Sequence, residues 1–362
     1  MNNKPSADRW VREAIKQQSS YRVPPAGEYI KLDAMENPWP MPAEINQAWR
    51  ESLANIHLNR YPDPQAADLA PRLRSVMNIP EDAGMMLGNG SDELIQVILM
   101  ALAGDDVTVL APTPSFVMYE VLARACDLNY AGVPLQQDFS LDMPAMHEAI
   151  ATHQPAVIFL ASPNNPTGAA FRRSDIEEIL QLAPGLVVVD EAYQPFVTAD
   201  DVGFMPRLAG YPDLIVMRTL SKVGLAGIRL GLIAGHPDWM NELDKLRLPY
   251  NINTLTQATA SFAIDHWSVF SGQIKAICEE RERVFASLSS MPGVQLWPSE
   301  TNFILFRVSE NRAESVHAGL INKGILIKCL HRAGSALDNC LRVTIGRQDE
   351  NDAFLSALSE LL

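Results

Sequence analysis

The chain has 362 residues, of which 47% are hydrophobic and 20% are charged, which is ordinary globular composition at a length that allows more than one domain. The net charge of −14, without any run of lysines and arginines, argues against a nucleic-acid partner. The apolar stretches are too short and too interrupted for a transmembrane helix, so no membrane partner is expected.

Cysteine and histidine usage indicates neither disulfides nor a metal. The four cysteines are scattered without a CxxC pair, which predicts free thiols in a reducing compartment. The seven histidines form no HxH or HExxH pattern, so we predict no metal site. The first residues lack the apolar core of a signal peptide. We therefore expect a cytoplasmic protein.

The first segment, residues 1–30, reads as an N-terminal arm. A short helix is predicted around 9–18, and the proline-rich stretch 21–25 is expected to lie extended over a surface. A strand at 30–33 and a turn at 36–40 follow.

From about residue 85 the pattern alternates between strands and helices. Nearly continuous apolar runs predict buried strands, and helical patterns lie at 94–102 and 174–182. The predicted strands are 107–110, 156–160, 186–189 and 214–217. This alternation predicts a mostly parallel sheet, which binds ligands at the carboxyl ends of its strands.

From about residue 252 the pattern changes to that of a smaller α+β domain. It comprises a long helical stretch at 255–288, strands at 303–306, 325–327 and 341–345, and a closing helix at 351–361. We predict a large domain at 31–251 and a small domain at 252–362, which part of the N-terminal segment joins.

The first candidate site is the glycine-rich loop 88–93, which precedes an apolar helix. The backbone of Gly90, Ser91 and Asp92 at a helix N-terminus is suited to hold a phosphate. The same residue types also cap helices, so this signal alone is weak. Asp92 and Glu93 are expected to cap the helix while backbone N–H groups point at the anion.

Two further loops follow predicted strands. Phe116 and Tyr119 are candidates to stack on an aromatic cofactor, although core packing is the commoner role of a lone aromatic residue. Asn165 lies in the loop SPNNPTG, which is either a plain turn or a rigid support for an amide that contacts a ring oxygen.

Asp190 ends the strand predicted at 186–189. It is either a turn aspartate or a buried carboxylate that pairs with a protonated pyridine nitrogen and so makes the ring an electron sink. Tyr193, three residues later, is either an ordinary strand-edge tyrosine or a partner of the ring's phenolic oxygen.

Lys222 follows the strand predicted at 214–217. A lone lysine there is usually a surface charge, but Ser221 and Arg229 beside it can bind a phosphate, and glycines nearby allow close backbone approach. A deprotonated lysine is a Schiff-base nucleophile. These residues are the parts needed to hold pyridoxal 5′-phosphate. Arg342, within the strand predicted at 341–345, needs an anionic partner such as an acidic side chain or a substrate carboxylate or phosphate.

The order of the motifs resembles that of the class I/II aminotransferases of the fold-type I pyridoxal-phosphate superfamily, over nearly the whole chain. The motifs are GNGSDE, PTPSFVMY, SPNNPTG, VVDEAY and LSK followed by LAGIRLG. The segments LDAMENP, NRYPD, SETNF and CLRVTIG are similar to those of histidinol-phosphate aminotransferases. The resemblance implies an aminotransferase-like fold, with a mostly parallel seven-stranded sheet between helices in the large domain.

The resemblance also implies roles for individual residues. Lys222 would hold the cofactor as a Schiff base and shuttle a proton, Asp190 would hold the ring nitrogen, and Asn165 and Tyr193 would flank the phenolic oxygen. The other implied cofactor contacts are Phe116 on the ring and, around the phosphate, Gly90, Ser91, Asp92, Ser221, Arg229 and Tyr61 of the partner subunit in a homodimer. The implied substrate contacts are Arg342, Lys328, Tyr21 and Asn37.

The implied reaction is transamination between histidinol phosphate and 2-oxoglutarate, which gives imidazole-acetol phosphate and glutamate. The planar fork of Arg342 suits both a carboxylate and a phosphate. Three features depart from the family pattern: Lys328 stands where many members have arginine, with Arg332 nearby; the turn after Lys222 is one residue shorter than is frequent; and Met35 replaces an asparagine.

The sequence is also compatible with other functions. An aromatic amino-acid aminotransferase and a phosphothreonine decarboxylase would use a similar pocket. A ligand-sensing regulatory domain would need a DNA-binding module, for which the segment before the family-like core leaves no room. A non-catalytic scaffold is disfavoured because Lys222, Asp190, Asn165, Tyr193 and Arg229 are all present.

Overall fold

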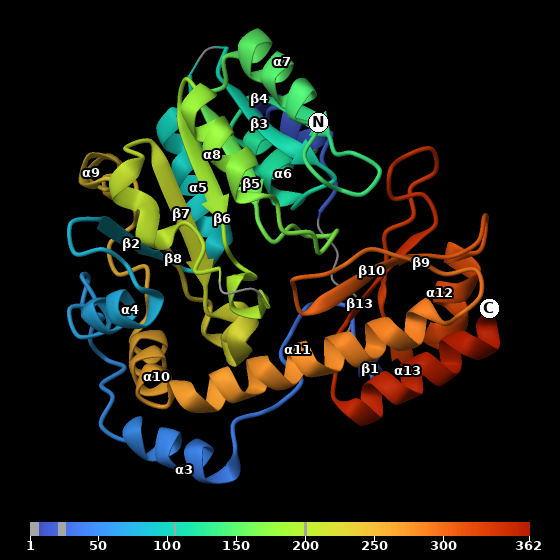
Figure 1. The fold of residues 1–362 in the computed structure, drawn as a ribbon. Coiled ribbons are helices and arrows are strands. Elements are labelled where there is room, and N and C mark those ends of the chain that lie inside the picture. The colour runs from blue at the N-terminus through green and yellow to red at the C-terminus, as the bar shows by residue number, and fades with distance from the viewer. Residues whose placement is uncertain (1–6, 21–26, 105, 199–200) are drawn as a thin grey trace, which may run out of the picture.

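The computed structural model describes residues 7–20, 27–104, 106–198 and 201–362, which form two parts (Figure 1). The larger part holds a seven-stranded sheet between helices, and the smaller part holds a four-stranded sheet backed by helices. The long helix α11 (Trp267–Ser289) runs from one part to the other. The predicted fold class is confirmed, whereas the domain boundaries at residues 30 and 251 stay predictions.

The large sheet is mostly parallel. Its strand order is β2-β8-β7-β6-β5-β3-β4, and β8 alone runs against its neighbours β2 and β7 in this sheet. Its strands are β2 (Gly84–Gly88), β3 (Thr108–Thr113), β4 (Asn129–Pro134), β5 (Val157–Ala161), β6 (Leu186–Asp190), β7 (Leu214–Thr219) and β8 (Gly231–Gly235). The four predicted strands correspond to β3, β5, β6 and β7.

Helices cover both faces of this sheet, which explains why β5, β6 and β7 are buried along their whole length. Successive side chains of β5 point to opposite faces, so Val157 and Phe159 pack on the side of α5, α6 and α9, whereas Ile158 and Leu160 pack on the side of α7 and α8. The helices of this part are α3 (Ala43–Ser52), α4 (Leu69–Met77), α5 (Ser91–Leu102), α6 (Met118–Ala125), α7 (Met143–His153), α8 (Arg173–Leu182) and α9 (Pro237–Asp244).

The small part contains an antiparallel sheet in the order β12-β13-β10-β9. Its strands are β9 (Gln295–Leu296), β10 (Phe303–Arg307), β12 (Lys328–Cys329) and β13 (Cys340–Thr344), and its helices are α12 (Ala313–Asn322) and α13 (Gln348–Leu361). A separate parallel pair joins β1 (Ile30–Lys31) to β11 (Ile325–Leu326). An early segment of the chain therefore completes the part built by its last third.

Several elements differ from the predicted ones. β2, β4 and β8 were not among the predicted strands, because each contains glycine, and β4 ends on proline, which weakens the strand pattern. The helix predicted at 255–288 is two helices, α10 (Thr254–Asp265) and α11, which meet at the non-helical residue His266. The strand predicted at 325–327 corresponds to β11 alone, and the following strand β12 was not predicted.

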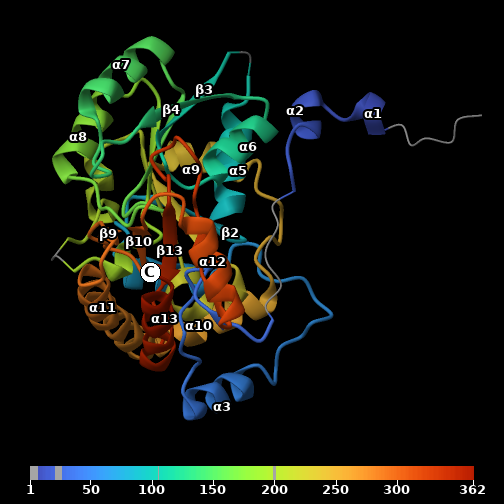
Figure 2. The ribbon, with the colours of Figure 1, turned by 90° about the vertical axis from the view of Figure 1, so that its right-hand side faces the viewer.

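The N-terminal segment contains two short helices in place of the single helix that was predicted. Instead of one helix around 9–18 there are α1 (Ala7–Trp10) and α2 (Glu13–Lys16), separated by the extended residue Arg12. Figure 2 shows both projecting from the large part near α6, where Arg12 donates to the carbonyl of Ala125. The proline-rich stretch 21–25, including Tyr21, lies outside the described residues.

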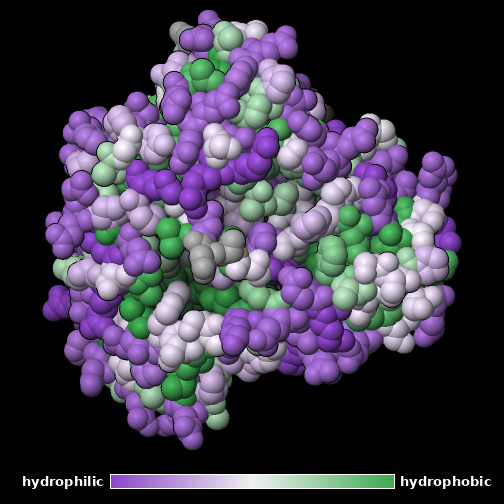
Figure 3. Space-filling model, viewed as in Figure 1, coloured by the Kyte–Doolittle hydropathy of each residue, from purple (hydrophilic) through white to green (hydrophobic). Residues whose placement is uncertain are grey.

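None of the helices in the described part of the chain has the length and apolar character that crossing a membrane requires. Figure 3 shows a largely polar face, with apolar residues gathered near the middle of the view and over the small part.

Candidate active site

The carboxyl ends of β5, β6 and β7 open onto one cavity of about 130 Å³. Parallel neighbouring strands end at the same edge of a sheet, so the loops that follow them converge there. The cavity is lined by nine of the predicted site residues: Ser91, Asp92, Phe116, Asn165, Asp190, Tyr193, Ser221, Lys222 and Arg229. Segments that are far apart in the sequence thus meet at one place.

Lys222 lies on a tight turn, Ser221–Leu225, directly after β7. Gly224 in this turn has φ 114°, a conformation that residues with side chains rarely adopt, and a Cβ added there would lie 2.9 Å from Nδ2 of Asn37. Asn37 donates from the same Nδ2 to the carbonyl of Val223 at 3.3 Å. Asn37 therefore supports the lysine turn and does not line the cavity.

The amine of Lys222 lies 5.6 Å from the centre of the Tyr193 ring. Burial lowers the pKa of Lys222 to about 8, and the positive charge of Arg342 acts in the same direction. The lysine therefore loses its proton far more readily than a surface lysine does.

The carboxylate of Asp190 is held by two donors. Its Oδ2 accepts from Oη of Tyr119 at 2.7 Å, and its Oδ1 accepts from the backbone N–H of Ala192 at 3.0 Å. Burial raises the pKa of Asp190 to about 6, and both hydrogen bonds oppose that rise. Tyr119 is completely buried and stacks on Phe159, with 4.7 Å between ring centres. Tyr119 therefore packs in the core, which is the commoner of the two roles considered for it, and it also donates to Asp190.

Asn165 links the cavity to the small part. Its Nδ2 lies 3.5 Å from Oη of Tyr193, and its Oδ1 accepts from Nη1 of Arg342 at 2.5 Å. Nη2 of Arg342 also donates to the carbonyl of Asp33 at 3.0 Å. Arg342, which comes from β13, thus reaches the loop that carries Asn165.

The N-terminus of α5, Arg229 and Ser221 together form one corner of the cavity. Nη1 of Arg229 lies 3.4 Å from Oγ of Ser221. Gly90 precedes the helix at φ 86°, and a Cβ there would lie 2.6 Å from Nη2 of Arg229. The bare glycine backbone therefore lets Arg229 approach the start of the helix closely, and both the guanidinium and the first N–H groups of a helix favour an anion.

The two acidic residues after Ser91 behave differently. Oε2 of Glu93 accepts from the N–H of Asn89 at 2.5 Å, but Asn89 precedes the N-cap residue Gly90 and α5 has no side-chain cap, so the predicted capping by Glu93 is wrong. Asp92 does not cap: it lines the cavity, and its Oδ1 is buried with no hydrogen-bond partner among the described residues. Burial raises the pKa of Asp92.

A second cavity of about 550 Å³ adjoins the first and shares Met35, Phe116 and Asn165 with it. Three cationic residues, Lys328, Arg332 and Arg342, line it from the small part. Lys328 and Arg342 face each other on the paired strands β12 and β13. This acidic chain thus keeps a locally basic pocket beside the first cavity.

Three of the predicted site residues that the structure describes, Gly90, Asn37 and Tyr61, line neither cavity. Tyr61 is 81% exposed and stacks on Tyr250, with 4.5 Å between ring centres. Two contacts were missed from the sequence: the bond from Tyr119 to Asp190 and the contact of Arg342 with Asn165. The only sequence signal for the contact between Tyr119 and Asp190 is the position of Tyr119, three residues after the predicted site residue Phe116.

The whole chain is similar to known aminotransferases. Residues 27–358 match the family aminotransferase class I and II. A histidinol-phosphate aminotransferase of Nitrosococcus oceani is 51% identical over 97% of this chain and 96% of its own length. One from Chromobacterium violaceum is 49% identical, with 96% of each chain covered.

The fold agrees with this finding. The crystal structure of histidinol-phosphate aminotransferase from Sinorhizobium meliloti in complex with pyridoxal-5′-phosphate superimposes with a TM-score of 0.86 at 22% identity, and covers 96% of each chain. The chain therefore belongs to the aminotransferase class I and II family and, within it, to the histidinol-phosphate aminotransferases.

Proposed function

We propose that this protein catalyses the pyridoxal 5′-phosphate-dependent transamination between L-histidinol phosphate and 2-oxoglutarate, which gives imidazole-acetol phosphate and glutamate in histidine biosynthesis. The observation that carries the proposal is one cavity lined by a lysine of lowered pKa, Lys222, and a buried carboxylate, Asp190, next to a cation-lined second cavity. Relatives with about half of their residues identical, named histidinol-phosphate aminotransferases, support the choice of substrate.

The residues around the first cavity fit pyridoxal phosphate. The corner formed by the start of α5, Arg229 and Ser221 would hold its phosphate, Phe116 would lie against its ring, and Asn165 and Tyr193 would contact its phenolic oxygen. When bound, the cofactor supplies a ring that withdraws the electrons left when a proton leaves the substrate Cα.

Lys222 and Asp190 would do the proton chemistry. As a neutral amine, Lys222 would hold the cofactor and carry the proton from and to the substrate Cα. Asp190, ionised within largely apolar surroundings, would favour the protonated form of the ring nitrogen. Tyr119 and the N–H of Ala192 stabilise that ionised form.

The second cavity would bind the anionic ends of the substrates. Arg342 offers a planar guanidinium that accepts either a carboxylate or a phosphate, and Lys328 and Arg332 add positive charge. Tyr21 is proposed as a further substrate contact, and Asn37 as one that also supports the lysine turn.

The proposed assembly is a cytoplasmic homodimer in which Tyr61 reaches the phosphate in the other subunit. In support, Tyr61 and Leu58 are 81% and 73% exposed, and Leu248, two residues before the ring on which Tyr61 stacks, is 69% exposed. Exposed apolar side chains gathered in this way are typical of an interaction surface. The cysteines are free thiols, which fits a reducing compartment.

The cofactor role of Lys222 is tested with Lys222→Ala. The wild-type protein should acquire the absorption band of a covalently bound cofactor, which borohydride reduces in place. The variant should lack both the covalent label and transamination. An unchanged rate in the variant would end the proposed mechanism.

The substrate is tested by comparing kcat/KM for histidinol phosphate with that for phenylalanine and for tyrosine. We expect histidinol phosphate to be preferred, because Lys328, Arg332 and Arg342 form a pocket for a doubly charged anion. Preference for an aromatic amino acid, or release of carbon dioxide from phosphothreonine, would replace the proposed substrate and leave the role of Lys222 intact.

A further inference from the structure

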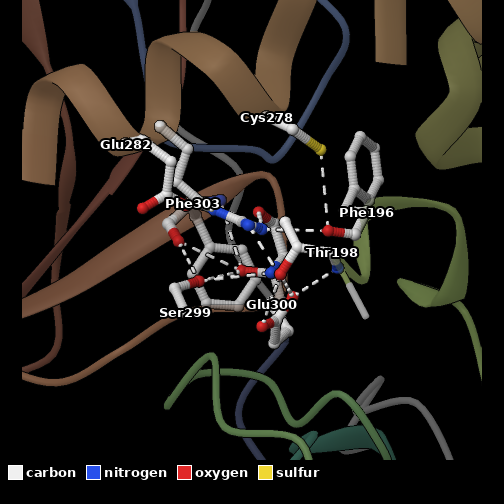
Figure 4. A network of polar contacts seen from close by, with 9 residues as sticks. Phe196, Thr198, Cys278, Glu282, Ser299, Glu300 and Phe303 are labelled. Atoms are coloured by element: carbon white, nitrogen blue, oxygen red, sulfur yellow. Dashed lines mark hydrogen bonds and ion pairs between the residues drawn. The ribbon is translucent and has the colours of Figure 1, made fainter. Parts of the chain in front are cut away.

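A polar cluster joins the two parts of the molecule. We call it the Glu300 cluster; it consists of Thr198, Arg281, Ser299, Glu300 and Thr301 (Figure 4). Its sequence signature, SETNF, is not used by any step proposed above.

Arg281, on α11, is the buried centre of the cluster, with only 1% of its surface exposed. Its Nη1 donates to the carbonyl of Thr301 at 2.9 Å and to the carbonyl of Phe196 at 3.1 Å. Its Nη2 lies 3.7 Å from Oε2 of Glu300. A buried guanidinium is costly unless it is paired, and Arg281 is paired with Glu282 at 3.1 Å as well as with Glu300, while its Nη1 holds both carbonyls.

Glu300 contacts two loops of the large part at once. Its carboxylate accepts from the N–H of Thr198 at 2.8 Å and from Oγ1 of Thr198 at 2.9 Å. Its own N–H donates to the carbonyl of Gly168 at 2.8 Å. A Cβ added at Gly168 would lie 2.6 Å from Oγ of Ser299, so the two backbones approach as closely as glycine allows.

Both of these loops carry residues that face the proposed cofactor. Asn165 lies three residues before Gly168, and Tyr193 lies five residues before Thr198. On the other side, the cluster leads directly into β10, where Leu305 pairs with Arg342. Glu300 therefore lies where the position of Arg342 relative to Asn165 and Tyr193 is set.

We propose that Glu300 is a positioning residue: it fixes the substrate-binding arginine Arg342 of the small part against the loops that hold Asn165 and Tyr193. The proposal rests on the proposed function for its kinetic readout. Because misplacing reacting groups by about 1 Å can cost up to about a hundredfold in rate, loss of this contact should act on catalysis without Glu300 touching substrate.

The experiment compares Glu300→Ala with Glu300→Gln, which keeps an acceptor for Thr198, in the cofactor-loaded protein. We expect kcat/KM for the amine substrate to fall on the order of tenfold in the alanine variant and by less than about threefold in the glutamine variant. The dissociation constant of pyridoxal phosphate should stay within about twofold of wild type, because the phosphate corner is elsewhere. Glu279→Ala is the matched control, since it removes an exposed carboxylate from α11 near Lys275; it should leave all values unchanged.

A second pair of variants tests the Thr198 contact. Thr198→Val removes the hydroxyl donor and should lower kcat/KM, whereas Thr198→Ser should behave like wild type. The double variant with Glu300→Ala should be no worse than Glu300→Ala alone, because both remove the same contact.

A substrate-free readout separates this proposal from the proposed function. Hydrogen exchange of the Thr198 amide, which donates to Glu300, should become at least about tenfold faster in Glu300→Ala. Unchanged exchange, unchanged kcat/KM, or a kinetic loss matched by equal loss of cofactor affinity would each overturn the positioning role. Failure of wild type to use histidinol phosphate would overturn the function, and the exchange result would still decide the role of Glu300.

Discussion

Lys222 and Asp190 share one cause for their altered acidity: both are buried, and burial disfavours the charged form of either group. The pKa of Lys222 falls to about 8 and that of Asp190 rises to about 6. At pH 7 most of the cofactor-free protein therefore carries an ionised Asp190 and a still protonated Lys222. The lysine must lose its proton before it reacts.

We accordingly expect the rate of covalent capture of pyridoxal phosphate by cofactor-free protein to increase with pH. Below pH 8 the neutral fraction of Lys222 grows about tenfold per pH unit, and it levels off above pH 8. Stopped-flow absorbance measures the rate. The same series with a simple alkylamine corrects for titration of the cofactor itself. A corrected rate that keeps rising about tenfold per pH unit well above pH 8 would contradict the lowered pKa of Lys222.

Tyr119→Phe should raise the pKa of Asp190 further. The variant keeps the ring that stacks on Phe159 but removes the hydrogen bond to the ionised carboxylate. A hydrogen bond to a charged group contributes about 1.5–3 kcal/mol, which corresponds to about one pKa unit or more. More of Asp190 would then be neutral at pH 7, so kcat should fall by about twofold to tenfold there and recover as pH rises.

A pH profile of kcat checks this prediction, with Tyr211→Phe as control because Tyr211 packs at the edge of the core away from both cavities. A profile that drops uniformly, with no alkaline shift, would assign Tyr119 a packing role alone.

The meeting of predicted residues at one cavity could be predicted where each follows its own apolar strand. Lys222, Asp190 and Asn165 are of this kind, because parallel strands must bring their carboxyl ends together. The contacts of Tyr119 and Arg342 could not be predicted, because each joins elements that only the packing of helices and sheets brings into range.

At the scale of elements, β7 is tied to the turn after β6 by a buried ion pair. Nη2 of Arg218 lies 2.7 Å from Oε2 of Glu191, and the two side chains are 11% and 1% exposed. The N–H of Phe204 also donates to Glu191. This pair fixes the direction of the segment between Asp190 and Tyr193.

Arg218→Met should lower the free energy of unfolding by about 3–5 kcal/mol, because it leaves the Glu191 carboxylate buried without its cation. The loss should shrink on acidification. Burial already raises the pKa of Glu191, and in the variant the folded state would favour the protonated form still more strongly. Urea unfolding at pH 7 and at lower pH measures both effects.

The matched control is Arg207→Met, whose partner Glu177 is partly exposed at 3.3 Å. It should change the unfolding free energy by less than about 1 kcal/mol. An equal fall in the free energy of unfolding in the two variants would show that burial of the pair Arg218–Glu191 does not increase its contribution to stability.

Elements were predictable in proportion to the strength of their periodic pattern. The buried strands β5, β6 and β7 were found within a residue or two, whereas the glycine-containing β2 and β8 were not. The division between α10 and α11 at His266 carries neither glycine nor proline, the residues that normally mark a helix end. That break is set by the packing of the two helices against different parts of the molecule.

At the scale of the whole molecule, the exposed Tyr61 predicts active sites shared between two subunits. Lys222→Ala and Tyr61→Phe should each impair activity at limiting pyridoxal phosphate. Mixed dimers of the two variants should regain about one quarter of wild-type activity, because half of the random dimers are hybrids and each hybrid has one intact site. Dissociation, mixing and assay of the two purified variants test this.

The control is each variant carried through the same treatment by itself, which should regain nothing. Absence of recovery in the mixture, with hybrids demonstrated by mass spectrometry, would place the action of Tyr61 within its own subunit.

The pairing of β1 with β11 has a consequence for the order in which this protein is made. Ile30 leaves the ribosome early, yet its partner Ile325 is synthesised only after the whole seven-stranded sheet, which closes between residues 84 and 235. Domains fold as they emerge, and contacts between distant residues form late. We therefore expect the nascent chain to build the Lys222 pocket first. Arg342 would reach this pocket only after the C-terminal third has emerged and β11 has paired with β1.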